Sequence, residues 1–391
     1  MIVIAVLAVI IIGVVVTLNF VPARLEKSMN KVQEHPPYDI SPAALKMHDG
    51  LTIMDWHSDS LLWKRNLLER ADYGHVDIPR LIEGNVAIQM FTAVTKSPRG
   101  QNYEENAADS DNITLLAMIQ LWPHATWSSL FERALYQARK LHEYASKNSD
   151  LLIIVRNRSQ LKQALAARAE AKNNGTAKPV MALLGIEGAH ALEGDLDNIQ
   201  ALYDAGYRMI GPHHFFDNKL GGSLHGVSQS GLTEFGRQVI QELDRMQIII
   251  DVAHASPAVV DDILQITTRP LVVSHTGIYG ACRSKRNIPD EHMLRIAEKG
   301  GLIGIGYWEG AVCDISPDGV VETLRYAIDL LGEDHVALGS DFDGTTTTAF
   351  DTSELAILTQ KMMDNGFTDS EITKVMGANS VKFLLSYLSE S

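Results

Sequence analysis

The segment Met54-Asp55-Trp56-His57-Ser58-Asp59 sets a pattern that the rest of this chain repeats. It closes an apolar run that begins at Leu51, and this run predicts a buried strand leading directly into a His-x-Asp pair. Because side chains alternate between the two faces of a strand, we expect His57 and Asp59 to point the same way. A neutral imidazole beside a carboxylate can bind a divalent metal. For this pair alone, a surface loop that happens to contain both residues is an equally good interpretation.

The pattern recurs along the chain: short apolar runs are followed by a His, Glu or Asp and alternate with segments of helical periodicity. The eight principal runs lie near residues 53, 87, 181, 209, 249, 271, 302 and 336, and residues 151–155 form an extra one. Continuous apolar strands separated by helices predict a parallel sheet that is covered on both faces. We therefore predict an α/β fold, a TIM-type (β/α)8 barrel over residues 51–391, with a mostly helical insertion at 96–150.

A doubly wound open sheet is the competing architecture. The barrel is favoured because polar residues follow many different strands, and barrel active sites are built at the carboxyl ends of their strands. The length of 391 residues is also compatible with one barrel and a preceding segment.

The first 21 residues contain no charged side chain and are rich in Ile, Val, Leu and Ala. About 20 such residues can span a bilayer, so residues 1–21 predict a transmembrane or signal-anchor segment. A proline-containing linker follows at 22–50. No Ala-x-Ala site is present, which favours an anchor that is retained. Arg24, Lys27 and Lys31 come next, and by the positive-inside rule they favour a catalytic part in the cytoplasm.

Net charge and cysteine content exclude several classes of protein. The formal net charge is −14, and we find no basic stripe, zinc-finger spacing or Walker-type loop, so a nucleic-acid partner is not expected. Cys282 and Cys313 are too few for a disulfide scaffold or a cysteine zinc site. From the residues alone, two free buried thiols are the simplest interpretation.

Histidines and carboxylates at the strand ends form a candidate set of metal ligands. A single His after an apolar run is more often structural, but here several are joined by acidic residues in the same kind of position. These residues are His57, Asp59, Glu187, His213, His214, His254, His275 and Asp341. Such a set suits a zinc-like metal, and a carboxylate such as Glu187 can bridge two ions. Asp341 beside a metal-activated water could move its proton, although a turn is the alternative for Asp341 and Asp343.

Eight stretches, taken together, resemble the membrane (renal) dipeptidase family of zinc metallopeptidases, within the amidohydrolase superfamily. They are Asp55 to Asp59, His75 to Leu81, Gly185 to His190, Arg208 to His214, Asp251 to His254, Ser274-His275, Arg286 to Asp290, and Gly339 to Gly344. The resemblance implies a (β/α)8 fold and two zinc ions per chain. One ion would be bound by His57 and Asp59 and the other by His254 and His275, with Glu187 bridging them.

The resemblance also implies roles for residues outside the ligand set. A metal-bridging hydroxide would attack the peptide carbonyl, His214 would hydrogen-bond the oxyanion, and Asp341 would be the acid/base residue. Arg286 matches the arginine that binds the terminal carboxylate of the substrate. Without the resemblance, Arg286 would be taken for a solvated charge in its basic run. His213 is then structural, and His190 matches no metal ligand of the family.

Two features of the sequence bear on specificity and compartment. Active members of the family carry a tyrosine near the substrate after the seventh strand, and the matching position here is Gly310, with Tyr307 close by. Cys282 and Cys313 match positions that are disulfide-bonded in animal members, which implies an oxidising, extracytoplasmic compartment, periplasmic or extracellular. This disagrees with the basic residues after the anchor, and we give the cysteines more weight. We expect no C-terminal lipid anchor, because the chain ends without a hydrophobic tail.

We therefore predict a membrane-tethered, dinuclear zinc dipeptidase. A related amidohydrolase that acts on a lactam, lactone or another amide is the first alternative. A catalytically inactive binding protein is the second, and the presence of all five ligands and Asp341 disfavours it. The residues do not decide whether the second residue of the dipeptide is L or D. A homodimer is compatible with the sequence.

Overall fold

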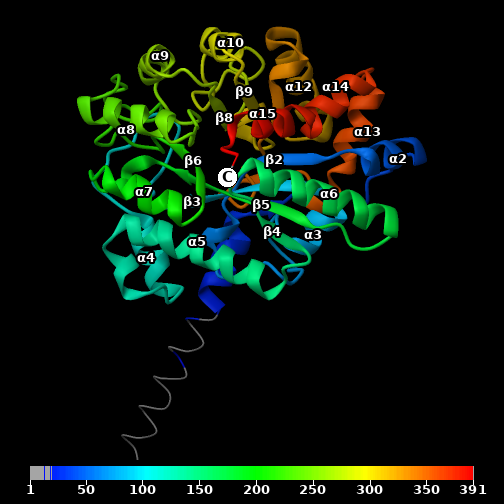
Figure 1. The fold of residues 1–391 in the computed structure, drawn as a ribbon, viewed down its shortest axis with the longest axis horizontal. Helices are drawn as coiled ribbons and strands as arrows, with labels where there is room; N and C mark the ends of the chain where they lie inside the picture. The colour runs from blue at the N-terminus through cyan, green and yellow to red at the C-terminus, as the bar shows by residue number, and fades with distance from the viewer. Residues whose placement is uncertain (1–12, 14–17, 19, 391) are drawn as a thin grey trace, which may run out of the picture.

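The structure, a computed structural model, describes residue 13, residue 18 and residues 20–390. Its centre is a curled parallel sheet surrounded by helices (Figure 1). Eight strands follow one another in space in the order β7, β6, β5, β3, β2, β10, β9, β8. A parallel bridge between Asp251 and Val272 joins the β7 end of this path to the β8 end. The α/β fold is confirmed, and the arrangement is consistent with the predicted TIM-type barrel.

The eight strands lie where the apolar runs predicted them. They are β2 (Ile53–Ser58), β3 (Val86–Val94), β5 (Val180–Glu187), β6 (Tyr207–Gly211), β7 (Ile249–Ile250), β8 (Val272–Thr276), β9 (Leu302–Ile305) and β10 (Val336–Leu338). The extra run forms β4 (Leu152–Ile154), which pairs with β5 outside the main path. Every residue of the eight strands is buried, as expected for parallel strands with both faces covered.

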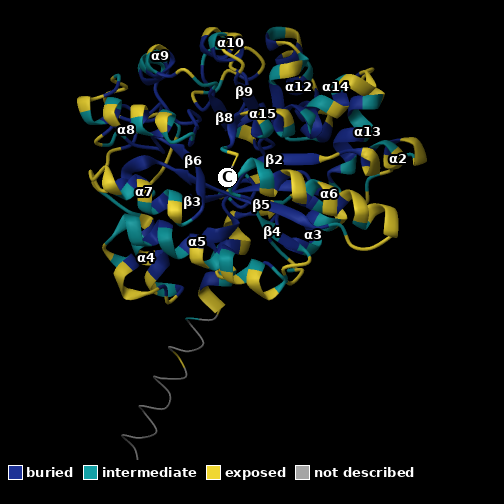
Figure 2. Ribbon diagram, viewed as in Figure 1, coloured by how far each residue is buried: buried dark blue, intermediate teal, exposed yellow. Residues whose placement is uncertain are grey.

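Helices form the outer layer, with buried inner faces and exposed outer faces (Figure 2). They are α2 (Pro42–Gly50), α3 (Ile78–Glu83), α4 (Asn112–Ile119), α5 (Leu130–Lys147), α6 (Arg158–Asn174), α7 (Asp197–Asp204), α8 (Glu234–Arg245), α9 (Pro257–Ile266), α10 (Asp290–Glu298), α11 (Glu309–Val312), α12 (Pro317–Leu331), α13 (Ala356–Asp364), α14 (Asp369–Thr373) and α15 (Asn379–Tyr387). Side-chain caps begin several of them, as Thr233 does for α8. Helix α6 begins at Arg158 because Asn157, rather than Ser159, caps it.

The predicted helical insertion at 96–150 is confirmed, since it contains α4 and α5. Helix α4 packs in an apolar cluster of its own, separate from the main core. We call this the α4 cluster; its buried members are Leu62, Trp63, Val94, Ile113, Leu116, Ala117 and Trp122. Leu62 belongs to the short 3-10 helix η1 (Ser60–Leu62) that follows β2. The insertion therefore packs beside the carboxyl ends of β2 and β3.

The prediction of a linker at 22–50 is wrong, because this segment is folded against the sheet domain. Residues 20–29 are helical, and β1 (Lys31–Val32) pairs with β11 (Thr347–Thr348). Ser41 caps α2 and Pro42 occupies its first turn, a combination that starts helices rather than linkers. The predicted membrane segment, residues 1–21, falls outside the described residues except at 13, 18, 20 and 21. None of the described helices is long and apolar enough to cross a membrane.

Cys282 and Cys313 form a disulfide, so two free thiols are not what the structure contains. The bond joins two segments that are 31 residues apart in sequence, one after β8 and one after α11. Both segments lie at the end of the sheet where the carboxyl ends of the strands gather. A cross-link in this position restrains the loops that surround the candidate site.

Candidate metal centre and active site

The carboxyl ends of the strands bring the predicted ligands together. Each ligand lies at, or shortly after, the carboxyl end of a strand: His57 and Asp59 (β2), Glu187 (β5), His214 (β6), His254 (β7), His275 (β8) and Asp341 (β10). All of them are buried except Asp341, whose side chain is 13% exposed. Residues that are far apart in the sequence thus meet because parallel strands end at the same edge.

Glu187 lies at the middle of this group. Its Oε1 atom is 2.7 Å from Nε2 of His254 and 3.2 Å from Nε2 of His275. The same oxygen is 3.9 Å from Nε2 of His57, and Oε2 is 3.3 Å from Nε2 of His214. Four imidazoles therefore direct a ring nitrogen toward one carboxylate. This is the position that a bridging ligand requires.

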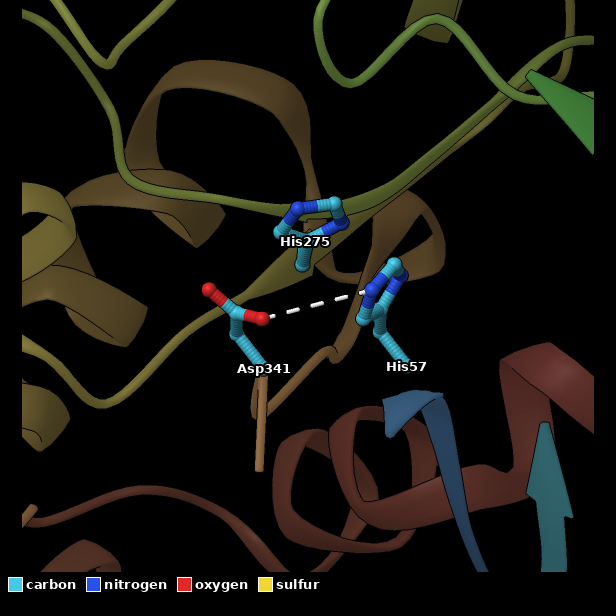
Figure 3. Close-up of side chains that lie close together, drawn as sticks. All are labelled: His57, His275 and Asp341. Atoms are coloured by element: carbon cyan, nitrogen blue, oxygen red, sulfur yellow. Dashed lines mark ion pairs between the residues drawn. The ribbon is translucent and has the colours of Figure 1, made fainter. Parts of the chain in front are cut away.

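His57 stands between two further carboxyl groups. Its Nε2 atom is 3.4 Å from Oδ1 of Asp59 and 4.0 Å from Oδ1 of Asp341. Figure 3 shows the Asp341 carboxyl group turned toward His57, with the ring of His275 beside them. The centroids of the two rings are 3.7 Å apart. Thr92 donates a hydrogen bond of 2.6 Å to Oδ1 of Asp59 and so fixes that carboxylate.

Two buried aspartates tie neighbouring strands together beneath the ligands. Asp55 accepts hydrogen bonds of 3.0 Å from the backbone N–H and the hydroxyl of Ser340, across the β2–β10 boundary. Asp251 accepts bonds of 2.8 and 2.6 Å from the N–H and hydroxyl of Ser274, across the β7–β8 boundary. Strand pairing is short at both boundaries. The two side chains therefore supply contacts that the backbone does not.

Sequence reasoning gave Asp55 and Asp251 no role of their own. A signal was present, because each precedes a predicted ligand by two or three residues, in Asp55-Trp56-His57 and in Asp251 to His254. The hydroxyl of Ser274 lies 3.1 Å from Nδ1 of His57 and 2.8 Å from Nδ1 of His275. Contacts to Nδ1 orient an imidazole so that Nε2 faces the centre, as is usual around metal-binding histidines.

Buried carboxyl groups determine the electrostatics of the centre. Burial raises the pKa of Glu187 well above its usual range, and the neighbouring Asp59 carboxylate raises it further. Burial also raises the pKa of Asp341, to about 8. The pKa of His214 is lowered by burial to about 4, so its ring is neutral at pH 7. A cation bound among these buried groups would stabilise the carboxylates in their ionised form and the imidazoles in their neutral form.

The residues present fit a divalent metal of the zinc type. Three overlapping groups have ligand atoms within 4.8 Å of one another: His57, Asp59 and Glu187; Glu187, His214 and His254; His57, His275 and Asp341. The first group is the set predicted around one ion. The Nε2 atoms of His254 and His275, predicted for the other ion, are 3.0 Å apart. Among the described residues, the buried Nε2 of His57 has no hydrogen-bond partner, as expected of a nitrogen that binds an ion.

Arg286 and His214 line a cavity of about 950 Å³ that opens over this centre. Arg286 is buried rather than solvated: it donates to the carbonyl oxygens of His275 and Ala253, at 2.9 and 3.2 Å. His214 directs Nδ1 to the carbonyl oxygen of Lys96 at 3.1 Å. His213, the remaining histidine of the predicted set, is buried and lies outside the three ligand groups. His190, which was not expected to bind a metal, also lies outside them, and its Nε2 is 3.0 Å from the hydroxyl of Thr95.

Tyr103 is a pocket residue that sequence reasoning missed. It comes from the loop before α4, lines the cavity and accepts a 3.0 Å hydrogen bond from the indole N–H of Trp308. A Cβ atom added at Gly310 would lie 2.6 Å from the Tyr103 ring, so the ring occupies the space that the glycine leaves free. Tyr307, the other candidate, is fully buried in the main core. The sequence signal was the glycine itself, but nothing local connects it with residue 103.

Asp343 is part of a buried network rather than a simple turn. Its carboxylate pairs with Arg65 and accepts hydrogen bonds from the Ser60 hydroxyl at 2.5 Å and the His75 N–H at 2.7 Å. Burial alone would raise the pKa of Asp343, but Arg65 and these hydrogen bonds outweigh it and hold the pKa well below its usual range. Asp341 and Asp343 both adopt positive φ, 57° and 64°. The network therefore stabilises a backbone conformation that non-glycine residues rarely adopt.

Known proteins resemble this chain in sequence and in fold. Residues 43–386 match the model of a family described as membrane dipeptidase, peptidase family M19. Dipeptidase aclJ of Aspergillus oryzae is 26% identical over 359 residues, covering 85% of this chain and 77% of the relative. Dipeptidase verJ of Clonostachys rogersoniana is 24% identical over 357 residues, covering 87% and 85%.

Two solved structures show the same fold. One is the crystal structure of a metallopeptidase described as dipeptidase AC, with a TM-score of 0.67 and 24% identity, covering 87% of this chain and 99% of that one. The other is a metallo peptidase from Rhodobacter sphaeroides, liganded with a phosphinate mimic of the dipeptide L-Ala-D-Ala. It has a TM-score of 0.67 and 24% identity, covering 86% and 99%.

Proposed function

Because the chain belongs to the membrane dipeptidase family, peptidase family M19, we propose that it is a dinuclear zinc dipeptidase. The family is one of metal-dependent dipeptidases, and the site geometry supports the finer statement. The observation that carries it is the convergence of four imidazole nitrogens on Glu187, with the Asp59 carboxylate in the same ligand group. In this proposal His57 and Asp59 bind one ion, His254 and His275 bind the other, and Glu187 bridges them.

Bound zinc would supply Lewis acidity and a nucleophilic water at neutral pH. The protein's own residues do the rest. Arg286 is positioned to bind the terminal carboxylate of a dipeptide, since its planar guanidinium matches that group. Asp341 accepts the proton of the attacking water on a carboxyl oxygen and gives it to the departing amine. Burial raises the pKa of Asp341, and the positive charge of bound metal ions would lower it again, so that the carboxylate is ionised when it accepts this proton.

His214 would stabilise the negative charge that develops on the carbonyl oxygen. Its Nδ1 faces a carbonyl oxygen, which only accepts, so Nδ1 carries a proton. A hydrogen bond from Nε2 to the substrate then requires a second proton on the ring. Negative charge on the substrate oxygen favours this imidazolium, whereas burial favours the neutral ring. The interaction is thereby strongest in the transition state, where it accelerates the reaction.

Metal content and peptide hydrolysis, measured on the same preparations, test this proposal. We expect close to two zinc ions per chain, and activity on dipeptides that is lost on chelation and restored by zinc. Asp341→Asn should keep the metal and lose activity, whereas His254→Ala should lose metal as well. Glu170→Gln, on the exposed face of α6, is the matched control and should change neither. Full activity in Asp341→Asn, or a metal-free active protein, would contradict the mechanism.

The substrate panel should include L,L- and L,D-dipeptides, lactams and lactones. We propose that the second residue is accepted in either configuration, since the related Rhodobacter enzyme binds a mimic of L-Ala-D-Ala. Zinc binding with hydrolysis of a lactam or lactone, but of no dipeptide, would replace the dipeptidase proposal with the alternative amidohydrolase.

We also propose that the domain works outside the cytoplasm, tethered by residues 1–21. The disulfide between Cys282 and Cys313 supports an oxidising compartment. Protease added to intact cells, or to spheroplasts if the compartment is periplasmic, should digest the domain. Protection from protease in both preparations would place it in the cytoplasm. Cross-linking of the full-length chain would test whether it forms a homodimer.

A further inference from the structure

Helix α4 and the turn after it present an apolar stripe to solvent. Residues 112–131 contain no Asp, Glu, Lys or Arg. The inner side of α4 packs in the α4 cluster, whereas Leu115, Met118 and Leu121 are 64%, 37% and 59% exposed. Because side chains three residues apart share one face of a helix, we call these three residues the α4 stripe. An outer helix usually carries charged or polar residues on this face, so the stripe is unusual.

The backbone keeps Leu121 in the stripe at a conformational cost. Its N–H donates to the carbonyl oxygen of Met118 at 3.1 Å, and its φ of 58° is left-handed. Glycine or asparagine usually occupies such a position at the end of a helix, because a Cβ atom is disfavoured there. The chain therefore exposes a leucine where folding alone favours a different residue.

The stripe lies beside the N-terminal segment of the domain. Leu25, in the helical segment 20–29, packs against the α4 cluster. Phe20 and Val21, at the start of this segment, are exposed. Half of the large apolar side chains that are exposed in the described part of the chain belong to 20–29 or 115–121, and Figure 1 shows both segments at the same end of the domain. Single exposed apolar residues are normal, but such a concentration indicates an interaction surface.

A basic cavity of about 270 Å³ adjoins the stripe. Its lining includes both neighbours of Leu121, three lysines and one acidic residue, which are Gln120, Trp122, Lys64, Lys140, Lys147 and Glu143. Lys64 and Lys147 are exposed, and Lys64 also donates to the carbonyl oxygen of Leu18 at 3.1 Å. The chain as a whole has a formal net charge of −14, so this cavity is a local basic site that suits a phosphate group.

We propose that the α4 stripe docks on a lipid bilayer that contains anionic lipids, with their phosphate groups at the basic cavity. Apolar side chains flanked by lysines are typical of elements that lie in the bilayer interface. The uncharged sequence before residue 18, the proposed tether, argues for a bilayer rather than a protein, because it leads into this same end of the domain. Leu115 also lines the cavity over the candidate metal centre, so docking would hold that cavity close to the bilayer surface.

Quenching of a fluorophore by labelled lipid tests this docking. Both cysteines of the chain form the disulfide, so Met118→Cys supplies a single free thiol for the fluorophore. The full-length protein with added zinc is reconstituted in vesicles of phosphatidylcholine and phosphatidylglycerol, with and without doxyl-labelled lipid. We expect quenching at Met118→Cys to be several times stronger than at Leu294→Cys, the matched control, because Leu294 is 36% exposed and lies on α10.

Substitutions in the labelled protein separate the apolar and the basic contributions. Leu121→Ser should lower the docked fraction severalfold, up to about tenfold, because one leucine side chain no longer leaves water. Val227→Ser, in the loop between β6 and α8, is its control at the same exposure. Lys147→Glu should lower quenching in the mixed vesicles but not in phosphatidylcholine alone, whereas Lys382→Glu on α15 should change neither.

The outcomes separate docking from the tether and from the activity. Equal quenching at positions 118 and 294, in protein that floats with the vesicles, would overturn docking and leave the tether and the dipeptidase function intact. Cross-linking of Met118→Cys chains to one another without quenching would assign the stripe to a second copy of this chain and would also overturn docking. Strong quenching in protein that alkaline carbonate strips from the vesicles would support docking and contradict the tether.

Discussion

Replacement of Asp343 with asparagine tests the buried ion pair that supports the catalytic segment. The change removes the charge that faces Arg65 while keeping the shape of the side chain. Glu26 also contacts Arg65, but burial raises the pKa of Glu26 to about 8, so at pH 7 it is mostly protonated. Asp343 therefore supplies the negative charge that balances the buried guanidinium of Arg65. Removing one partner of a buried pair costs about 3–5 kcal/mol, and we expect a loss of this size in the free energy of unfolding.

Urea denaturation at pH 7, with equal zinc in all samples, measures this loss. Asp318→Asn is the control, because Asp318 pairs with Lys361 at 2.9 Å but is 54% exposed, and such a surface pair contributes at most about 1 kcal/mol. The pKa of Asp343 is depressed, so its stabilisation is present above the unfolded pKa of 3.8 and is lost only as the pH falls through and below it. The losses at pH 7 and pH 5.5 should agree on this account. A loss below about 1 kcal/mol at pH 7 would refute the reasoning.

Three further changes probe other parts of the molecule. Burial lowers the pKa of His48 from 6.5 to about 4, so the stability that its neutral ring allows is present above pH 6.5 and is lost as the pH falls toward 4. Over this range the free energy of unfolding of the unmodified chain should fall by up to about 3 kcal/mol more than that of His48→Gln, and an equal fall in both proteins, measured by urea denaturation, would contradict this. Gly310→Ala should displace Tyr103 and raise KM about fivefold, the equivalent of one lost hydrogen bond, whereas Gly50→Ala, where a Cβ meets nothing within 4 Å, should leave KM unchanged. Changing both Cys282 and Cys313 to serine should cost about 3–4 kcal/mol for a separation of 31 residues, and a reductant should lower the unmodified chain to the same stability without affecting the variant.

Local patterns were enough to predict most of the architecture. Each strand is a short apolar run, and each candidate ligand directly follows one, so no long-range information is needed to place Glu187 or His275 at the carboxyl edge of a parallel sheet. The resemblance to a known family then supplied the roles of Arg286 and His214. The structure brings all these side chains to one cavity. Their roles stay predictions until metal and activity are measured.

What could not be predicted depends on pairs of residues that are distant in the sequence. Residue 31 pairs with residue 347, so the N-terminal segment appeared to be a linker when its own composition was considered alone. Tyr103 reaches across the pocket to Gly310, and Asp55 binds Ser340. In none of these pairs does the sequence around one partner indicate where the other partner lies. Only the tertiary fold supplies that information.

The two aspartate-bridged boundaries divide the ring of strands into unequal arcs, one from β2 to β7 and one from β8 to β10. The candidate ligands come from both arcs, with His275 and Asp341 on the shorter one. A cation bound by ligands from both arcs would link the arcs together, and its release would allow local opening along the two boundaries. Amide protons at these boundaries, such as the N–H of Val252 that donates to Val272 at 2.8 Å, should exchange faster with solvent after chelation than those between β3 and β5. The rate of amide hydrogen exchange at the two boundaries would thus report whether a metal ion occupies the centre.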